Sequence, residues 1–215
     1  MIEIYLIRHG ETDWNVARRL QGSTDIPLNE NGIKLAEVTA KGMADIEFDY
    51  IFTSPLQRAK TTALIIKGNR DIPIIEDARL KEISFGIYEG LCCSKENYTI
   101  PDPDFLKFFK APNEYVPPEG GESIKELCDR TTSLLRDIVN NPEYENKKIL
   151  LSAHGATVKA LLSSFTIKDF SEFWNGGVHQ NCGLSLVTCK DGQFHLEWEN
   201  KTFYEAEVIR GYYEE

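Results

Sequence analysis

CxxC pairs of cysteines and long apolar runs are both missing from this sequence of 215 residues. Its five cysteines are an odd number without CxxC spacing, which argues against a disulfide framework and against a zinc knuckle. Reduced thiols are typical of cytoplasmic proteins. No apolar run approaches the ~18 residues of a membrane span, and the first residues, MIEIYLIRHG, lack the basic and then apolar regions of a signal peptide. We therefore expect a cytoplasmic protein that makes no use of a membrane.

Positive charge is also scarce, because 24 Lys and Arg residues face 34 Asp and Glu residues, for a formal net charge of −10 at pH 7. The overall field repels polyanions, so we expect no nucleic-acid partner and no anionic membrane surface. Any anion that binds must meet a local cluster of positive groups. A metalloenzyme built on His9 and His154 is a weak alternative, because the four histidines show neither HxxH nor HxxxH spacing.

The remaining composition is that of an ordinary globular protein, with 41% hydrophobic and 27% charged residues. At ~150 residues per domain, the length allows one substantial domain with an insertion. We expect a single domain over residues 1–215. Residues 92–120 are rich in Pro, Phe, Tyr and Lys without a clean period, so we interpret them as an insertion over the functional site rather than as a separate domain.

Strand-like and helix-like segments alternate along the chain. The pattern predicts strands over residues 2–7, 50–53, 72–75 and 148–153. It predicts helices over residues 30–43 after the N-cap Asn29, after Ser54 as a capping residue with Pro55 in the first helical position, over 124–138, and after His154-Gly155. Asp191-Gly192 signals a closing hairpin. Such alternation predicts a three-layer α/β/α sandwich with a mostly parallel sheet.

Polar residues follow three of the predicted strands, at His9, Ser54 and His154. Because ligands of such folds bind beyond the carboxyl ends of the strands, we expect these segments to converge. Arg8 and His9 would place a fixed cation beside a nucleophilic imidazole. Arg58, one turn into the following helix, adds a guanidinium suited to bidentate binding of an oxyanion.

Each of these residues also has a plainer interpretation when it is taken alone. A histidine at a strand end, such as His9, is more often structural, and His154 fits a core histidine bonded to the backbone. Arg58 and Glu82 fit ordinary surface charges. The individual residues therefore leave the function open.

Four sequence motifs, taken together, narrow the choice. They are Leu6-Ile7-Arg8-His9-Gly10-Glu11-Thr12 with Asn15, Ser54-Pro55-Leu56-Gln57-Arg58-Ala59, Glu82-Ile83-Ser84-Phe85-Gly86 with Tyr88-Glu89-Gly90, and Ser152-Ala153-His154-Gly155. In this order they resemble the motifs of the histidine phosphatase superfamily, the phosphoglycerate mutase-like proteins. With Gln21-Gly22 and Asp25–Asn29 the resemblance extends from residue 2 to about 190. Four ordered motifs are far more specific than one.

The resemblance implies phosphoryl transfer through a phosphohistidine, with His9 as the nucleophile and Glu82 as the proton donor. Arg8, Arg58 and His154 would form the phosphate pocket, and the two arginines would keep the His9 imidazole neutral and its lone pair available. It implies no metal and no cofactor, and the expected partner is a small phosphorylated metabolite; a homodimer is left open. Further contacts with the substrate are expected from Asn15, Gln21, Gly22, Gly155 and Ala156.

Phosphatases and phosphoglycerate mutases of this family share that machinery, so the choice between them depends on a second anion site. The mutases hold a second phosphate or carboxylate with further arginines, whereas no arginine lies between Arg79 and Arg130 here. We therefore expect a phosphatase, with a cofactor-dependent phosphoglycerate mutase and a non-catalytic regulatory protein as alternatives. Positive charge for a second anionic group of the substrate would come from Lys95, Lys107 or Lys110, which bind as point donors. Five aromatic residues of the insertion would either stack on the substrate or form a small core: Tyr98, Phe105, Phe108, Phe109 and Tyr115.

Overall fold

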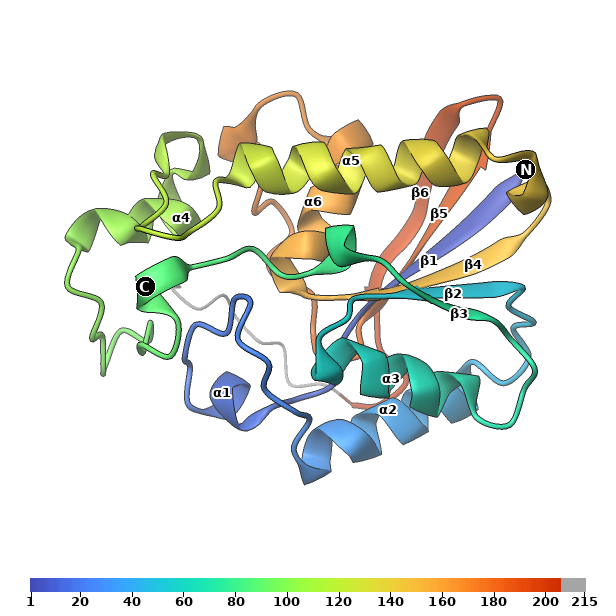
Figure 1. The fold of residues 1–215 in the computed structure, drawn as a ribbon, viewed down its shortest axis with the longest axis horizontal. Helices are drawn as coiled ribbons and strands as arrows, with labels where there is room; N and C mark the ends of the chain where they lie inside the picture. Colours follow the sequence, from blue (N-terminus) through green and yellow to red (C-terminus); the bar gives the residue numbers. More distant parts are fainter. Residues whose placement is uncertain (206–215) are drawn as a thin grey trace.

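The computed structural model describes residues 1–205, in which one six-stranded sheet has helices on both faces (Figure 1). Across the sheet the strands run in the order β3-β2-β4-β1-β5-β6. The first four strands in this order pair in parallel, whereas β5 pairs antiparallel with both β1 and β6. The predicted α/β sandwich with a mostly parallel sheet is confirmed. The strands are β1 (Ile2–Arg8), β2 (Tyr50–Thr53), β3 (Ile74–Glu76), β4 (Lys148–Ala153), β5 (Leu184–Lys190) and β6 (Gln193–Lys201).

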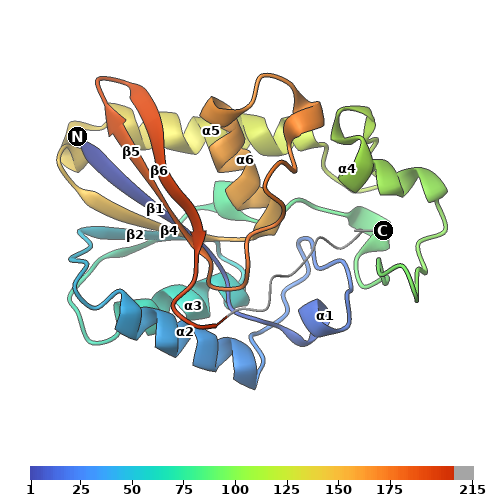
Figure 2. The same cartoon turned by 180° about the vertical axis from the view of Figure 1, so that it is seen from behind.

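Helices cover the sheet from both sides, with α2 and α3 against one face and α5 and α6 against the other (Figure 2). Within residues 1–205, no helix is long and apolar enough to cross a membrane. The α-helices are α1 (Asp13–Val16), α2 (Glu30–Gly42), α3 (Gln57–Lys67), α4 (Lys107–Lys110), α5 (Ile124–Asn140) and α6 (Gly155–Thr166). Short 3-10 turns are η1 (Ala78–Leu80), η2 (Gly86–Tyr88), η3 (Pro103–Leu106), η4 (Pro112–Glu114), η5 (Pro142–Tyr144) and η6 (Phe170–Glu172).

The central strand β1 is apolar on both faces, which explains why both faces are covered. Ile4 and Leu6 lie in the cluster beneath α5 and α6. Tyr5 and Ile7, which point the other way, lie in the cluster beneath α2 and α3. A strand buried on both sides reads as a continuous apolar run, and its end is therefore visible in the sequence as a change to polar residues.

Two helix starts were predicted from capping residues, and the structure confirms one of them but not the other. Asn29 caps α2 as predicted, because its side chain accepts a hydrogen bond from the Gly32 N–H. The predicted start of α3 is wrong, since this helix begins at Gln57 rather than at Pro55 and its N-cap has no side-chain hydrogen bond. The hydroxyl of Ser54 lies outside the helix, where it accepts from the Leu56 N–H at 3.3 Å and bonds a histidine of the functional site at 2.8 Å.

The hairpin and one strand boundary are set by backbone chemistry. Asp191 and Gly192 join β5 to β6 with φ of 51° and 76°, the positive values that a two-residue hairpin turn of type I′ requires, so the predicted hairpin is confirmed. β3 covers residues 74–76 rather than 72–75. Pro73 has no N–H to donate and joins the pairing only through its carbonyl oxygen, which accepts from the Ile51 N–H at 3.0 Å.

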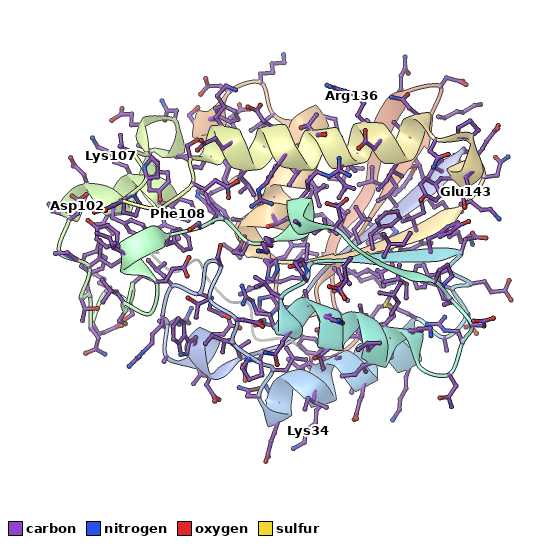
Figure 3. All side chains as sticks on the ribbon, in the orientation of Figure 1. Lys34, Asp102, Lys107, Phe108, Arg136 and Glu143 are labelled. Carbon is purple, nitrogen blue, oxygen red and sulfur yellow. The ribbon has the colours of Figure 1, made fainter. Side chains whose placement is uncertain are left out.

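Residues 92–120 form short helical turns, including α4, at one side of the sandwich, where Figure 3 labels Asp102, Lys107 and Phe108. Their buried aromatic side chains pack with residues of α5 and of the loop after α6, such as Leu127 and Phe173. Phe105 has five aromatic ring neighbours, two in the preceding loop and three within residues 92–120. These contacts make the small core that the sequence offered as one alternative.

Candidate active site

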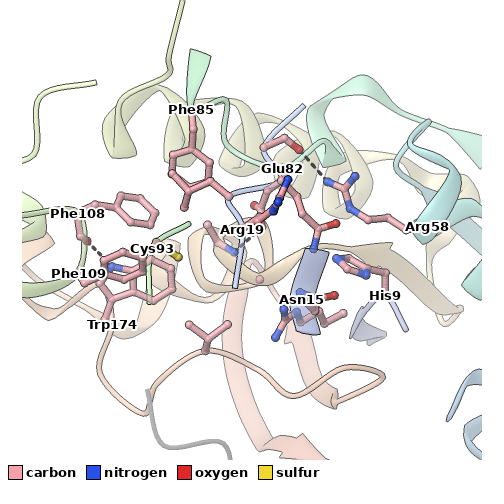
Figure 4. Close-up of a pocket in the computed structure, with 17 residues that line it drawn as sticks. His9, Asn15, Arg19, Arg58, Glu82, Phe85, Cys93, Phe108, Phe109 and Trp174 are labelled. Atoms are coloured by element: carbon pink, nitrogen blue, oxygen red, sulfur yellow. Dashed lines mark hydrogen bonds between the residues drawn. The ribbon is translucent and has the colours of Figure 1, made fainter. Parts of the chain in front are cut away.

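A pocket opens at the carboxyl ends of β1, β2 and β4 (Figure 4). Nine of the ten site residues expected from the sequence line it, and His154 does not. The polar part of the lining consists of Arg8, His9, Asn15, Arg19, Gln21, Arg58 and Glu82, with Gly22, Gly155 and Ala156 beside them. The apolar part comprises Leu20, Phe85, Cys93, Phe108, Phe109, Trp174 and Val178.

His9 is held as a neutral imidazole with one nitrogen left for a ligand. Its Nδ1 lies 2.6 Å from the carbonyl oxygen of Gly10. A carbonyl oxygen can only accept, so Nδ1 carries the proton and the lone pair is on Nε2. Among the described residues, no group hydrogen-bonds Nε2. The ring is therefore oriented with its nucleophilic nitrogen toward the pocket that it lines.

Burial and two arginines keep this ring unprotonated. Burial lowers the pKa of His9 well below 6.5, and the positive charges of Arg58 and Arg8 lower it further. The expectation from the sequence named only the arginines, whereas loss of hydration is the larger cause. His9 therefore keeps its lone pair throughout the neutral and mildly acidic range.

Arg58 is fixed by three acceptors. Its Nε donates to Nδ1 of His154 at 3.1 Å, and its terminal nitrogens donate to the carbonyl oxygens of Thr24 and Gly22 at 2.7 Å each. A guanidinium has five N–H groups, so two are left for a ligand. Burial lowers the pKa of Arg58 to about 10, which still leaves it charged at neutral pH.

The structure places His154 behind the pocket, not in its wall. It is fully buried, and since its Nδ1 accepts from Arg58, the proton lies on Nε2, which donates to Ser54 Oγ at 2.8 Å. Burial lowers the pKa of His154 well below 6.5, with Arg58 as the next cause. Both ring nitrogens are thus hydrogen-bonded within the protein, and the direct phosphate contact expected from the sequence stays a prediction. In this arrangement His154 orients Arg58.

Arg8 offers the clearest unfilled donor. Its Nη1 donates to the carbonyl oxygen of His179 at 2.5 Å, whereas its buried Nε has no hydrogen-bond partner among the described residues. A side chain added at Gly155 would place its Cβ 3.7 Å from this Nε and 3.0 Å from Val178 Cγ1. Glycine at position 155 therefore keeps open the space in front of Arg8.

Glu82 lies at the N-terminus of α6. Its Oε2 accepts from the Ala156 N–H at 3.1 Å, and its Oε1 accepts from the N–H groups of Ile83 and Thr157 and from the Thr157 hydroxyl, at 3.0 to 3.1 Å. These bonds fix the carboxylate in the pocket wall. The Ala156 N–H, from which a substrate contact was expected, donates to Glu82 instead. The Gly10 N–H also donates within the protein, to the Thr62 hydroxyl at 3.0 Å.

Two amide side chains complete the polar wall. Asn15 Oδ1 accepts from the backbone N–H and the hydroxyl of Thr12, both at 3.0 Å, which leaves its Nδ2 as a donor. Gln21 is 8% exposed, and its Oε1 is buried without a partner among the described residues. A buried amide oxygen without a partner destabilises the protein, and a ligand that donates a hydrogen bond satisfies it.

Sequence reasoning missed the role of Glu89. Its Oε1 accepts from the N–H groups of Ser23 and Phe85, at 2.8 and 3.1 Å, and its Oε2 accepts from the Thr24 hydroxyl. Glu89 thereby joins the loop that holds Arg58 to the loop that follows Glu82. It belongs to the third motif, but its partners lie up to 66 residues away, so no local pattern indicates them.

Arg19 was missed as well. It lines the pocket from the loop after α1, outside the four motifs and outside the segment that was searched for a distal cation. The three lysines that were expected there do not line the pocket, and Lys107 pairs with Asp104 and Glu114 at 3.8 and 3.6 Å. The arginine that lines the pocket beside Arg8 and Arg58 is therefore Arg19, which the sequence reasoning did not consider.

Acid is expected to destabilise the folded chain through three buried histidines. Burial lowers the folded-state pKa of His9, His154 and His179, the last to about 3, whereas unfolded histidines titrate near 6.5. Below about pH 6.5 the unfolded state binds more protons, so the free energy of unfolding falls as the pH falls, by ~1.4 kcal/mol per pH unit for each histidine. Urea titrations between pH 7 and 5 measure this slope.

A matched pair of variants isolates the histidine contribution. His179→Gln removes one buried titrating group and should lower the slope by about one third. His195→Gln removes an exposed histidine of β6 and should leave the slope unchanged. A free energy of unfolding that does not change between pH 6.5 and 5 would contradict the assignment of neutral buried rings.

Comparison with known proteins shows the family of the chain. The sequence profile of the histidine phosphatase superfamily (branch 1) matches residues 4–202. The chain belongs to this superfamily. This histidine phosphatase is 40% identical over 166 residues to the uncharacterized phosphatase PhoE of Bacillus subtilis strain 168, covering 77% of this chain and 78% of that protein.

Two further relatives extend the match over more of the chain. The metal-independent phosphoserine phosphatase of Arabidopsis thaliana is 35% identical over 197 residues, which covers 91% of this histidine phosphatase and 79% of the plant protein. The structure of YhfR from Bacillus stearothermophilus shares the fold with a TM-score of 0.86 and 34% identity, covering 93% of this chain and 97% of that one. The phosphoglycerate mutase-like fold expected from the sequence is thereby confirmed.

Proposed function

We propose that this histidine phosphatase hydrolyses phosphomonoesters of small metabolites through a phosphohistidine at His9. The observation that carries the proposal is the state of that ring: Nδ1–H is bonded to Gly10, Nε2 is free in the pocket, and Arg8 and Arg58 stand beside it. A neutral imidazole nitrogen among fixed cations is a nucleophile for an anionic phosphoryl group. The Bacillus subtilis and Arabidopsis relatives described above are named as phosphatases, which supports the same reaction.

In the first step, Nε2 of His9 attacks phosphorus and the P–O bond to the leaving group breaks. The free Nε–H of Arg8 and the two unused N–H groups of Arg58 stabilise the charge on the equatorial oxygens. Asn15 contributes its Nδ2–H as a neutral donor. Glu82 acts as the general acid and gives a proton to the departing alkoxide.

In the second step, water replaces the histidine. The Glu82 carboxylate accepts a proton from water, whose oxygen forms the new bond to phosphorus as the bond from phosphorus to Nε2 breaks. Inorganic phosphate leaves, and His9 returns to its neutral form. The hydrogen bonds from the start of α6 keep Glu82 in one place for both proton transfers.

We further propose that the reaction needs no metal ion. The pocket already supplies two guanidinium groups for the transferring phosphoryl group. Within residues 1–205, no three side chains of His, Cys, Asp or Glu are grouped so as to hold a metal. The Arabidopsis relative is named as metal-independent.

A panel of phosphomonoesters, assayed with and without a chelator, tests the proposed function. We expect release of inorganic phosphate that is unchanged by EDTA. With 3-phosphoglycerate and 2,3-bisphosphoglycerate supplied, phosphate release should be faster than exchange between the 2- and 3-isomers. Faster isomer exchange would identify a mutase, and no turnover of any ester would identify a binding protein.

A further inference from the structure

Arg19 is the third cation of the pocket, and its charge is uncompensated. The side chain is exposed and lines the same cavity as His9. Among residues 1–205, no hydrogen bond or ion pair is formed by its guanidinium. By contrast, Arg79 and Arg130 each bind a carboxylate. In a chain of net charge −10, an arginine that has no carboxylate partner beside a ligand pocket is poised for an external anion.

The backbone that carries Arg19 is fixed. Residues 18–20 pair with residues 90–93: the Leu20 N–H donates to the Leu91 carbonyl at 3.0 Å, the Gly90 N–H to the Leu20 carbonyl at 2.8 Å, and the Cys93 N–H to the Arg18 carbonyl at 2.9 Å. The side chain therefore starts from a defined position. An arginine on a fixed backbone loses less entropy on binding than a cation on a mobile loop.

The surroundings of Arg19 select the kind of anion. Arg8 and Arg58 are committed to the phosphoryl group under the proposed function, so a second anion meets a single guanidinium. The same pocket has an apolar lining that includes Leu20, Phe109 and Trp174. One fork-shaped cation without a second positive group matches a carboxylate, a planar monoanion, better than a second phosphate dianion.

Gln21 supplies the second observation. Two residues after Arg19, its buried Oε1 lacks a donor in a side chain that lines the pocket. A hydroxyl or ammonium group on the carbon chain between phosphate and carboxylate would provide that hydrogen bond. The unfilled acceptor and the unfilled cation thus describe two parts of one substrate.

We propose that Arg19 is a specificity-determining residue that binds the carboxylate of the substrate, so that the preferred substrates are phosphate esters of hydroxy or amino acids. This inference rests on the proposed function, which supplies the site for the phosphate itself. A salt-bridged hydrogen bond of this kind is worth about tenfold to hundredfold in affinity.

The test measures binding in a His9→Ala background, so that its outcome does not depend on turnover. Two ligand pairs differ chiefly in the carboxylate: O-phosphoserine against O-phosphoethanolamine, and 3-phosphoglycerate against glycerol 3-phosphate. Calorimetry should show that the carboxylate-bearing member of each pair binds about tenfold to hundredfold more tightly. Adding Arg19→Gln should erase this difference and leave the affinity for inorganic phosphate unchanged. Arg136→Gln, which removes an exposed arginine of α5, is the matched control.

Three results would overturn the assignment. The carboxylate-bearing ligands could bind no more tightly than their partners, the preference could survive Arg19→Gln, or that variant could weaken inorganic phosphate equally, which would place Arg19 on the phosphoryl group. The protein with His9 intact is assayed in parallel with p-nitrophenyl phosphate. If p-nitrophenyl phosphate is not turned over, the proposed hydrolase function is refuted. The binding measurements with the two ligand pairs still decide the role of Arg19.

Discussion

Substitution of His9 by alanine is expected to lower kcat by several orders of magnitude with every phosphomonoester. Removing the nucleophile of a concerted site disables its partners as well, so the loss is far larger than that of one hydrogen bond. The reason lies in the geometry, because within residues 1–205 no other uncommitted nucleophilic nitrogen faces Arg8 and Arg58: both ring nitrogens of His154 are bonded. Steady-state kinetics with a good aryl substrate measure the effect.

The control for this variant is His195→Ala, which removes an exposed ring from β6. It should retain normal turnover. Thermal unfolding of both variants shows that the folded state is intact. Near-normal activity of His9→Ala would show that the phosphoryl group is not transferred to this histidine.

The second large effect is expected for Glu82→Gln with substrates that have poor leaving groups. An alkoxide needs a proton as the P–O bond breaks, whereas a nitrophenolate leaves without one, so alkyl phosphates should lose about 10²–10⁴ in kcat and aryl phosphates much less. Glutamine keeps the size of the side chain and an oxygen that can accept from the amides of Ala156 and Thr157. The comparison of two substrate classes therefore separates proton transfer from positioning.

Glu145→Gln serves as the matched control, because this exposed glutamate lies in the turn before β4, at the opposite end of the strand from His154. It should leave both substrate classes unaffected. An equal loss of alkyl and aryl turnover in Glu82→Gln would show that Glu82 orients the start of α6 without donating a proton.

The position of the site could be predicted because it follows from backbone order. The apolar run of β1 ends at Arg8 and His9, and that of β4 ends at His154, so parallel pairing places both polar ends at one edge of the sheet. The motif around Arg58 indicated the correct helix, although not its first residue. Ser54 looked like a cap because hydroxyls before prolines usually are, but its hydroxyl accepts from His154.

What could not be predicted depends on contacts between distant residues. That His154 orients Arg58 from behind is visible only in the fold, since 96 residues separate them. The same holds for the Glu89 carboxylate, which holds the loop of Ser23 and Thr24. Arg19 is one of two adjacent arginines, and only the pairing of its loop with residues 90–93 shows that it faces the pocket.

The most direct test of the central claim is to trap the phosphoenzyme. Rapid quenching of the protein with a ³²P-labelled phosphomonoester, followed by peptide mapping, locates the transferred group. The account predicts an acid-labile, alkali-stable phosphoramidate on His9 that forms and decays at rates compatible with turnover and is absent from His9→Ala. Release of phosphate with no labelled protein at any time, or a label on a different residue, would contradict it.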